Sequence, residues 1–323
     1  MKKIMAMLLA AVMLLSLAAC TGSETAKSDD GTYTIGICQL VQHEALDAAT
    51  EGFKQALIDE FGDKVTFDEQ NASGDTQNCT NIVNSFVSKD VDLIMANATP
   101  ALQAAYNGTM DIPVLGTSVT EYGVALQLEN FNGTVGGNVS GTSDLAPLDQ
   151  QAAMIKEWFP DVKNVGLLYC SAEANSKYQV DVVKKELGAM GYTCAEYSFS
   201  DSNDVQAVAQ KAAAESDVIY IPTDNTAASS AEIIRSVCTQ GEKKVPVIAG
   251  EENLCKGCGV ATLSISYYDL GYTTGKMAAQ ILKGEADIST MPIAYSETFT
   301  KKYNKEICDE LGLTPPEGYE AIA

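Results

Sequence analysis

Polar side chains follow six apolar runs of the sequence, where a small ligand would meet them. These loops cover 38–43, 97–101, 116–121, 169–176, 222–226 and 250–253, and they are rich in Thr, Ser, Asn and Asp. Together with the GTSD segment at 141–144, they supply the candidate ligand-binding residues Gln39, Thr99, Thr117, Ser118, Asp144, Ser171, Asn175, Asp224, Asn225 and Glu251. These residue types hydrogen-bond small polar molecules, but they also cap helices, and for each residue both roles stay open.

The charges near these loops suit a zwitterion. An ammonium group needs a carboxylate, which Asp144, Asp224 or Glu251 can supply at about 1–3 kcal/mol for each charge-assisted hydrogen bond. The only arginine, Arg235, lies in the middle of an expected helix, on a solvated or lobe-covering face. A ligand carboxylate would therefore meet hydroxyl groups at helix starts, where the helix dipole favours an anion. Candidates for an apolar wall are Tyr106, Tyr169, Tyr220, Tyr267 and Tyr268.

The sequence lacks the residue patterns of common enzymes. His43 is the only histidine, and we expect it at a helix start near the cleft and not as a base. No nucleophile elbow or phosphate-binding glycine loop is found. The CKGC segment at 255–258 has no second half of a zinc site, so a local disulfide or two free thiols are expected there. We predict no catalytic residue, no cofactor and no metal site.

The first twenty residues are typical of an export signal. Lys2 and Lys3 precede an apolar run that ends in Leu17-Ala18-Ala19-Cys20. This end resembles a bacterial lipobox, in which Cys20 would carry lipid. Residues 21–32 are polar and read as a flexible tether. The sequence therefore predicts an exported protein, anchored by lipid at the outer face of the cytoplasmic membrane.

The net charge of −22 excludes two classes of partner. Nucleic acids and anionic lipid surfaces are themselves negative and would repel so acidic a protein. We expect a monomer that contacts the membrane only through its N-terminal lipid.

Strand and helix signals alternate along the rest of the chain, which predicts an α/β fold with parallel sheets. The segments VDLIMANATPA at 91–101 and SDVIYIPTDNTA at 216–227 repeat one strand–turn–helix pattern. We interpret them as the same unit in two Rossmann-like lobes joined by a three-strand hinge. The expected first lobe is 33–141 plus 267–291, and the expected second lobe is 142–266 plus 292–323.

Several of these segments together resemble one known family. They are IGICQLVQHEALDAATEGF, DEQNASGD, ATPALQAA, GTSD, LLYCSAEANS, IPTDNT, VIAGEE and YYDLGYTTGKMAAQIL. The set resembles the tryptophan/tyrosine-type substrate-binding lipoproteins of ABC importers, over about residues 33–311. The resemblance implies a periplasmic-binding-protein type I fold, a small-molecule ligand and an ABC permease as partner.

The resulting hypothesis is a binder of an aromatic amino acid. Its ligand would lie between the two copies of the repeated unit, with Thr99 near the carboxylate and Asp224 near the ammonium group. Two alternatives stay open. The chain could bind another small solute, such as a branched-chain amino acid, a nucleoside or a sugar, or it could be a soluble ligand sensor of the same fold.

Overall fold

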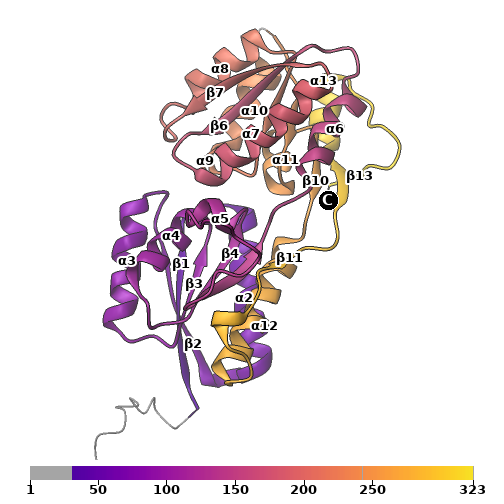
Figure 1. The fold of residues 1–323 in the computed structure, drawn as a ribbon. Coiled ribbons are helices and arrows are strands. Elements are labelled where there is room, and N and C mark those ends of the chain that lie inside the picture. Colours follow the sequence, from indigo (N-terminus) through magenta and orange to yellow (C-terminus); the bar gives the residue numbers. More distant parts are fainter. Residues whose placement is uncertain (1–30, 242, 323) are drawn as a thin grey trace, which may run out of the picture. The chain divides into compact units, whose positions relative to one another are not determined.

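Two separate β-sheets organise the chain. The computed structural model describes residues 31–241 and 243–322. The first sheet has the order β11-β5-β4-β3-β1-β2, and all its strand pairs are parallel. Its strands are β1 (Tyr33–Gln39), β2 (Val65–Asn71), β3 (Leu93–Asn97), β4 (Val114–Val119), β5 (Val139–Ser143) and β11 (Ala294–Tyr295). The expected α/β fold with two parallel-dominated sheets is confirmed (Figure 1).

The second sheet has the order β13-β12-β10-β9-β8-β6-β7. Its strands are β6 (Asn164–Cys170), β7 (Thr193–Phe199), β8 (Val218–Ile221), β9 (Val247–Ala249), β10 (Ala261–Ser264), β12 (Thr300–Tyr303) and β13 (Glu320–Ala321). Only the β10–β12 pair is antiparallel. Strands β3 and β8 hold the same place in the two sheets, between β1 and β4 and between β6 and β9. The repeated sequence segments are therefore equivalent units.

Helices cover both faces of each sheet. Around the first sheet they are α2 (Glu44–Phe61), α3 (Thr76–Ser88), α4 (Thr99–Gly108), α5 (Tyr122–Ala125) and α12 (Tyr267–Leu282). Around the second they are α6 (Leu148–Trp158), α7 (Ala174–Ala189), α8 (Val205–Glu215), α9 (Asn225–Ser229), α10 (Ala231–Gln240), α11 (Glu252–Cys258) and α13 (Lys305–Leu311). Short 3₁₀ turns follow at Gly62–Lys64 and Ile288–Thr290. None of the helices in the described ranges is long and apolar enough to cross a bilayer.

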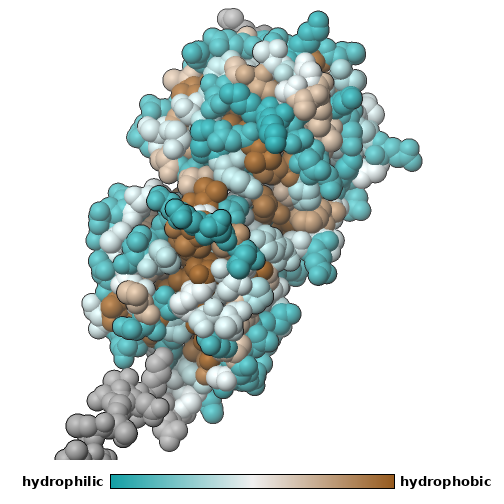
Figure 2. Space-filling view, viewed as in Figure 1, coloured by the Kyte–Doolittle hydropathy of each residue, from teal (hydrophilic) through white to brown (hydrophobic). Residues whose placement is uncertain are grey.

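The cores follow from the alternation of side chains along the strands. In β1, Ile35 and Ile37 face one side and pack with Phe53 of α2, while Cys38 faces the other side and packs with Phe86 of α3. Both sides are buried, so these strands appear in the sequence as nearly continuous apolar runs. Hydrophilic residues dominate the outer surface of the face in Figure 2.

The helices α2 and α12 approach each other closely because glycines line their contact (Figure 1). A Cβ atom on Gly271 would lie 1.9 Å from the carbonyl oxygen of Ala49, and one on Gly52 would lie 2.1 Å from that of Tyr268. No larger residue fits at either position without moving a helix. This contact holds α12, and with it Tyr267, against the first sheet.

The chain passes between the two sheets three times, after β5, after β10 and after β11. The expected lobe boundaries need two adjustments. β5 extends the first sheet to Ser143, beyond the expected end at 141. The short strand β11 at Ala294–Tyr295 pairs with β5, so it belongs with the first sheet, although the expected second lobe includes 292–323.

Strand β5 was not expected because its residues are small and polar. Gly141 lies beside Gly116 of β4, and a Cβ on Gly141 would lie 2.1 Å from the Gly116 carbonyl oxygen. The position therefore requires glycine, whose presence weakens the strand signal.

Eight cysteines within the described residues are free thiols, and seven of them are buried. The CKGC pair, Cys255 and Cys258, lies inside α11 as two thiols, which settles the alternative left open by the sequence. The expected signal peptide at 1–20, the lipid-bearing Cys20 and the tether up to residue 30 lie outside the described residues.

Candidate functional site

A small cavity lies at the carboxyl ends of strands from both sheets, the place where open parallel sheets bind ligands. Its volume is about 10 Å³. Among the residues that line it are His43, Ser118, Thr120 and Asp144 from the side of the first sheet, Asn175, Thr223, Asp224, Asn225 and Glu251 from the second, and Tyr267 at the start of α12. We call this the cleft cavity. Both halves of the repeated architecture contribute to one site.

Buried polar atoms without a hydrogen bond concentrate at the cleft cavity. Among the described residues eight buried side-chain atoms lack a partner, and four of them belong to its lining. They are His43 Nδ1, Ser118 Oγ, Asp144 Oδ1 and Asn175 Oδ1. Each unsatisfied buried polar group costs about 1–3 kcal/mol. A clustering of such groups marks a place that a polar ligand would stabilise.

His43 precedes the first turn of α2 and joins the two sides of the cavity. Its Nε2 lies 3.3 Å from Oδ1 of Asn225. The Asn225 amide nitrogen donates to Glu173 at 2.6 Å, so its oxygen is the acceptor and His43 Nε2 carries the proton. Burial lowers the pKa of His43 and favours the neutral ring. The Nδ1 atom is then a free acceptor.

A buried carboxylate that sequence reasoning missed, Glu173, organises the start of α9. It accepts hydrogen bonds from the backbone nitrogens of Asn225 at 3.1 Å and Thr226 at 2.9 Å, and from the Thr226 hydroxyl at 2.8 Å. The residue lies in the polar loop 169–176, where the sequence points to Ser171 and Asn175 as candidates. Its partners lie some fifty residues further along the chain, so no local pattern reveals this role.

Asp224 caps α9. Its Oδ1 accepts from the Ala227 nitrogen at 2.8 Å, and its Oδ2 accepts from the Cys170 nitrogen at 2.6 Å. Burial, and then the charge of Glu173, raise the pKa of Asp224 to about 8. Both oxygens already serve the backbone of the second sheet.

Glu251 has the same kind of role at α11. Its side chain accepts hydrogen bonds from the backbone nitrogens of Asn253, at 2.7 Å, and of Leu254. Burial raises the pKa of Glu251 to about 7.

Asp144 differs from the other two carboxylates of the lining. Its Oδ2 accepts a hydrogen bond from the Tyr267 hydroxyl at 2.9 Å, and its Oδ1 has no hydrogen bond of good geometry. Burial raises the pKa of Asp144, while the hydroxyls of Tyr267 and Thr120 act in the opposite direction. Asp144 is therefore the one carboxylate of the lining with an oxygen that serves no partner of good geometry.

Comparison with known proteins assigns the family. Residues 34–323 match the family described as ABC transporter substrate binding protein. The chain belongs to this family. A tyrosine-binding protein of Clostridioides difficile (strain R20291) is 38% identical over 307 residues, which are 90% of this chain and 87% of the relative. The members are substrate-binding proteins of ABC transporters and not enzymes, as expected from the missing catalytic residues.

Two solved structures resemble this substrate-binding protein over 90% of its length. A Streptococcus pneumonia ABC domain in complex with L-Trp is 33% identical, with a TM-score of 0.84 and all of that chain covered. The ligand-free, open structure of a Clostridium difficile substrate-binding protein with adhesive properties is 38% identical, with a TM-score of 0.67 and 99% of that chain covered. The fold is the periplasmic-binding-protein type I fold.

Six of the ten candidate residues of this substrate-binding protein line the cleft cavity. They are Ser118, Asp144, Asn175, Asp224, Asn225 and Glu251. The other four lie elsewhere. The Gln39 amide bonds Asp47 and Thr50, Thr99 is buried at the start of α4, the Thr117 hydroxyl pairs with that of Thr142, and the exposed Ser171 donates to the Phe199 carbonyl.

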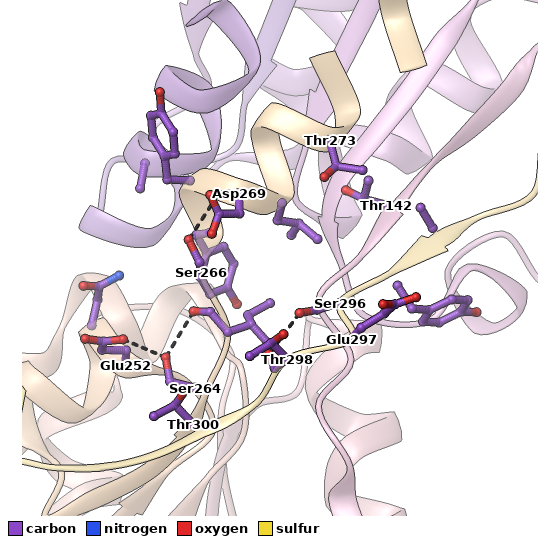
Figure 3. A pocket seen from close by; sticks show the side chains of 18 of the residues that line it. Thr142, Glu252, Ser264, Ser266, Asp269, Thr273, Ser296, Glu297, Thr298 and Thr300 are labelled. Atoms are coloured by element: carbon purple, nitrogen blue, oxygen red, sulfur yellow. Dashed lines mark hydrogen bonds between the residues drawn. The ribbon is translucent and has the colours of Figure 1, made fainter. Parts of the chain in front are cut away.

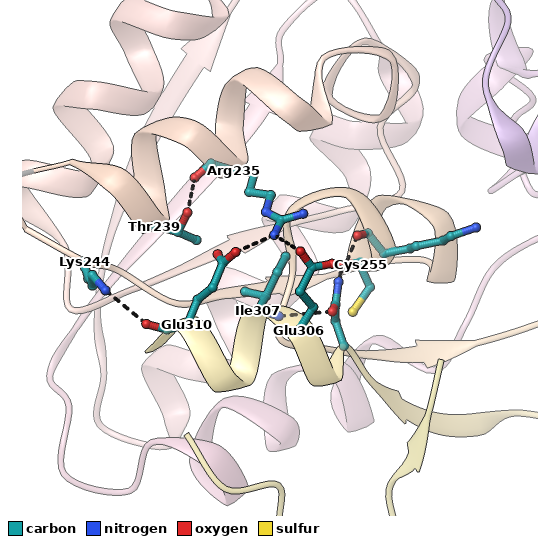
Figure 4. Close-up of polar contacts among 9 residues, drawn as sticks. Arg235, Thr239, Lys244, Cys255, Glu306, Ile307 and Glu310 are labelled. Carbon is teal, nitrogen blue, oxygen red and sulfur yellow. Dashed lines mark hydrogen bonds and ion pairs between the residues drawn. The ribbon is translucent and has the colours of Figure 1, made fainter. Parts of the chain in front are cut away.

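Of the five tyrosines expected to form a wall, only Tyr267 lines the cleft cavity. Tyr220 is buried against Gln151, Tyr169 bonds Glu196, and Tyr106 and Tyr268 are partly exposed. Arg235 pairs with Glu306 and Glu310 of α13, at 2.6 Å each (Figure 4). The side chain of Arg235 therefore links α10 to α13 on the outside of the second lobe, which agrees with the lobe-covering face expected from the sequence.

A larger cavity of about 680 Å³ lies between the crossing segments around 264–270 and 294–300 (Figure 3). Two of its four charged side chains neutralise each other, because Glu252 forms an ion pair with Lys302 at 2.7 Å and also accepts from Ser264 at 2.7 Å. The other two are Asp269 and Glu297. None of the unpartnered buried atoms of the described residues belongs to its lining. The cleft cavity is therefore the better candidate for the ligand site.

Proposed function

We propose that this protein is an extracytoplasmic, lipid-anchored substrate-binding protein that captures an aromatic amino acid and delivers it to an ABC permease. The observation that carries the proposal is the group of unpartnered polar atoms that both sides of the cleft cavity contribute. Two relatives that are more than 30% identical and whose names state a ligand, a tyrosine-binding protein and a domain in complex with L-Trp, support an aromatic amino acid.

The ligand is captured by closure of the two lobes. At about 10 Å³ the cleft cavity has room for about one water molecule, so an amino acid enters only when the lobes separate. The protein resembles the L-Trp complex more than the ligand-free, open relative, although the open relative is closer in sequence. The contacts His43–Asn225 and Glu44–Lys256, the latter at 3.1 Å, link the lobes and support a closed arrangement.

Anchoring rests on the N-terminal sequence. Cys20 follows an apolar run and small residues, the arrangement of a lipoprotein signal. Metabolic labelling with a fatty acid in a bacterial host should mark the wild-type protein, and Cys20→Ser should remove the label. A labelled Cys20→Ser protein would contradict the anchor.

Ligand identity is tested with a panel of small solutes. We expect L-tyrosine, L-tryptophan or L-phenylalanine to raise the melting temperature, since a ligand at a hundredfold excess over Kd stabilises by about 2.7 kcal/mol. Leucine, a purine nucleoside and a hexose serve as controls, and isothermal titration calorimetry gives the affinities. A preference for one of the controls, or no response to any solute, would overturn the assignment. Uptake of the bound amino acid by a strain that lacks the protein distinguishes the two roles. Uptake should fall if the protein serves transport and stay unchanged if it serves sensing.

A further inference from the structure

We propose that three hydrogen-bond acceptors of the cleft cavity, Asp144 Oδ1, Asn175 Oδ1 and His43 Nδ1, select the ligand by its ammonium group. This inference rests on the proposed function, because it takes the ligand to be an amino acid. It goes further by stating which end of the ligand determines binding and which side chains recognise it.

The orientation of Asn175 follows from its own contacts. Its amide nitrogen donates to the carbonyl oxygen of Thr223 at 3.0 Å and to Glu173 at 3.2 Å. A backbone carbonyl and a carboxylate only accept, so the nitrogen must face them. The amide oxygen is left without a partner, and the side chain is only 5% exposed.

The state of His43 follows in the same way. Its Nε2 faces the Asn225 oxygen, whose amide nitrogen is held by Glu173. The neutral imidazole that burial favours then presents a lone pair at Nδ1. This atom is buried and has no partner.

Asp144 supplies the charge. Asp224 and Glu251 also line the cavity, but each uses both oxygens to accept backbone N–H groups. Asp144 is 4% exposed and keeps Oδ1 without a partner of good geometry. The three unpartnered acceptors match in number the three N–H donors of an ammonium group.

The charge around the cavity supports recognition of a cation. Asp144, Asp224 and Glu251 line it, and no lysine or arginine in the described part of the chain does. Burial raises the pKa of each of these carboxyl groups, and a positive charge placed among them stabilises the ionised form. When His43 is neutral, the hydroxyl of Ser118 is the one hydrogen-bond donor among the four unpartnered atoms. We expect this hydroxyl to bind the ligand carboxylate. The ammonium end therefore contributes most of the polar affinity.

The test compares ligand analogues and two variants that each replace one carboxyl group of the same cavity by its amide. Isothermal titration calorimetry is run on the wild-type protein with L-tyrosine, with tyramine, which lacks the carboxylate, and with 3-(4-hydroxyphenyl)propionate, which lacks the amine. We expect the analogue without the amine to bind about a hundredfold more weakly than L-tyrosine, and tyramine to lose less. L-Tryptophan and tryptamine replace the tyrosine pair if tryptophan binds more tightly.

The Asp144→Asn variant should bind L-tyrosine about a hundredfold more weakly than the wild type. The Glu251→Gln variant should lose about tenfold in affinity or less. Thermal melting without ligand checks that each variant folds. If a variant does not fold, the analogue series on the wild-type protein tests the inference by itself. Equal losses in the two variants, or equal binding of the analogue without the amine, would overturn the inference while leaving the proposed function intact. Absence of any binding of tyrosine, tryptophan and phenylalanine by the wild type would overturn both.

Discussion

The hydroxyl of Tyr267 donates a hydrogen bond to Oδ2 of Asp144 at 2.9 Å, and this contact connects two of the segments that pass between the sheets. Asp144 directly follows β5, and Tyr267 begins α12. The same carboxylate offers its other oxygen to the cleft cavity. A ligand that binds Asp144 therefore contacts the group that ties the crossing segments together.

Tyr267→Phe should lower the free energy of unfolding of the unliganded protein by about 1–3 kcal/mol, because a buried carboxylate loses its hydroxyl partner. Urea unfolding followed by circular dichroism measures the change. The control is Tyr268→Phe, since Tyr268 is 37% exposed and its stacking on Tyr272 needs only the ring. Equal stability of the two variants would contradict a structural role for the Tyr267 hydroxyl.

The unliganded protein should become less stable as the pH rises from about 4.5 to 8. Glu251 has a pKa of about 7 when folded, against 4.5 for an exposed glutamate, and Asp224 about 8 against 3.8. The folded protein thus keeps protons that the unfolded chain releases, and its stability is fully present only below the unfolded pKa values. Between its unfolded and its folded pKa, each such group lowers the free energy of unfolding by up to about 1.4 kcal/mol per pH unit.

Urea unfolding at pH 5, 6, 7 and 8 measures this slope, and Glu251→Gln should reduce it between pH 5 and 7. Carboxylates with a lowered pKa, such as Glu196 and Asp217, act below this range. The lowered pKa of His43 acts in the opposite direction below about pH 6.5, so the net loss of stability should be steepest between about pH 6.5 and 8. Stability that stayed level or rose toward pH 8 would show that the buried carboxylates are ionised in the folded protein at low cost.

Gly271→Ala should destabilise the protein by about 1–3 kcal/mol or more, because the added methyl group would lie 1.9 Å from the Ala49 carbonyl oxygen. Thermal unfolding measures the effect. Gly188→Ala in α7 is the matched control, since nothing lies within 4 Å of its added Cβ, and it should stabilise by about 0.5–1 kcal/mol. Similar melting temperatures for the two variants would mean that α2 and α12 separate easily.

Asp224→Ala should lower the stability of the unliganded protein by about 1–3 kcal/mol, because it removes the acceptor of the Ala227 and Cys170 N–H groups. The sequence suggested Asp224 as the ammonium partner and Thr99 as its counterpart across the cleft. Thr99→Ala should cost less, since the Thr99 hydroxyl has no partner to lose. Lost ligand binding by Asp224→Ala with unchanged unliganded stability would favour direct contact with the ligand instead.

Much of the fold is readable from the sequence because parallel strands are buried on both faces. The strands β3 and β8 appear as apolar runs, each followed by a polar turn. The helices α5 and α11 have four and seven residues, too few to show a helical period, so the sequence does not reveal them.

The candidate site was predictable to the level of loops and not of single side chains. Thr117 and Ser118 are neighbours, yet only Ser118 reaches the cavity. Ser118 has a φ of 54° where the register of β4 with β5 shifts between Gly116 and Val119, and such a bulge redirects a side chain. Glu173 was missed because its partners come from a distant loop. Whether a polar residue faces a ligand or a backbone group depends on such long-range contacts.

The pairing of β11 with β5 affects the order in which the protein can form. The first sheet takes its last strand from residues 294–295 and its close-packed helix α12 from 267–282. Strands β6 to β10 of the second sheet lie within one stretch, 164–264. A chain synthesised from its N-terminus therefore has the central strands of the second lobe complete before the first lobe can close. The lobe that begins the protein is therefore among the last parts whose strands and helices are all available for folding.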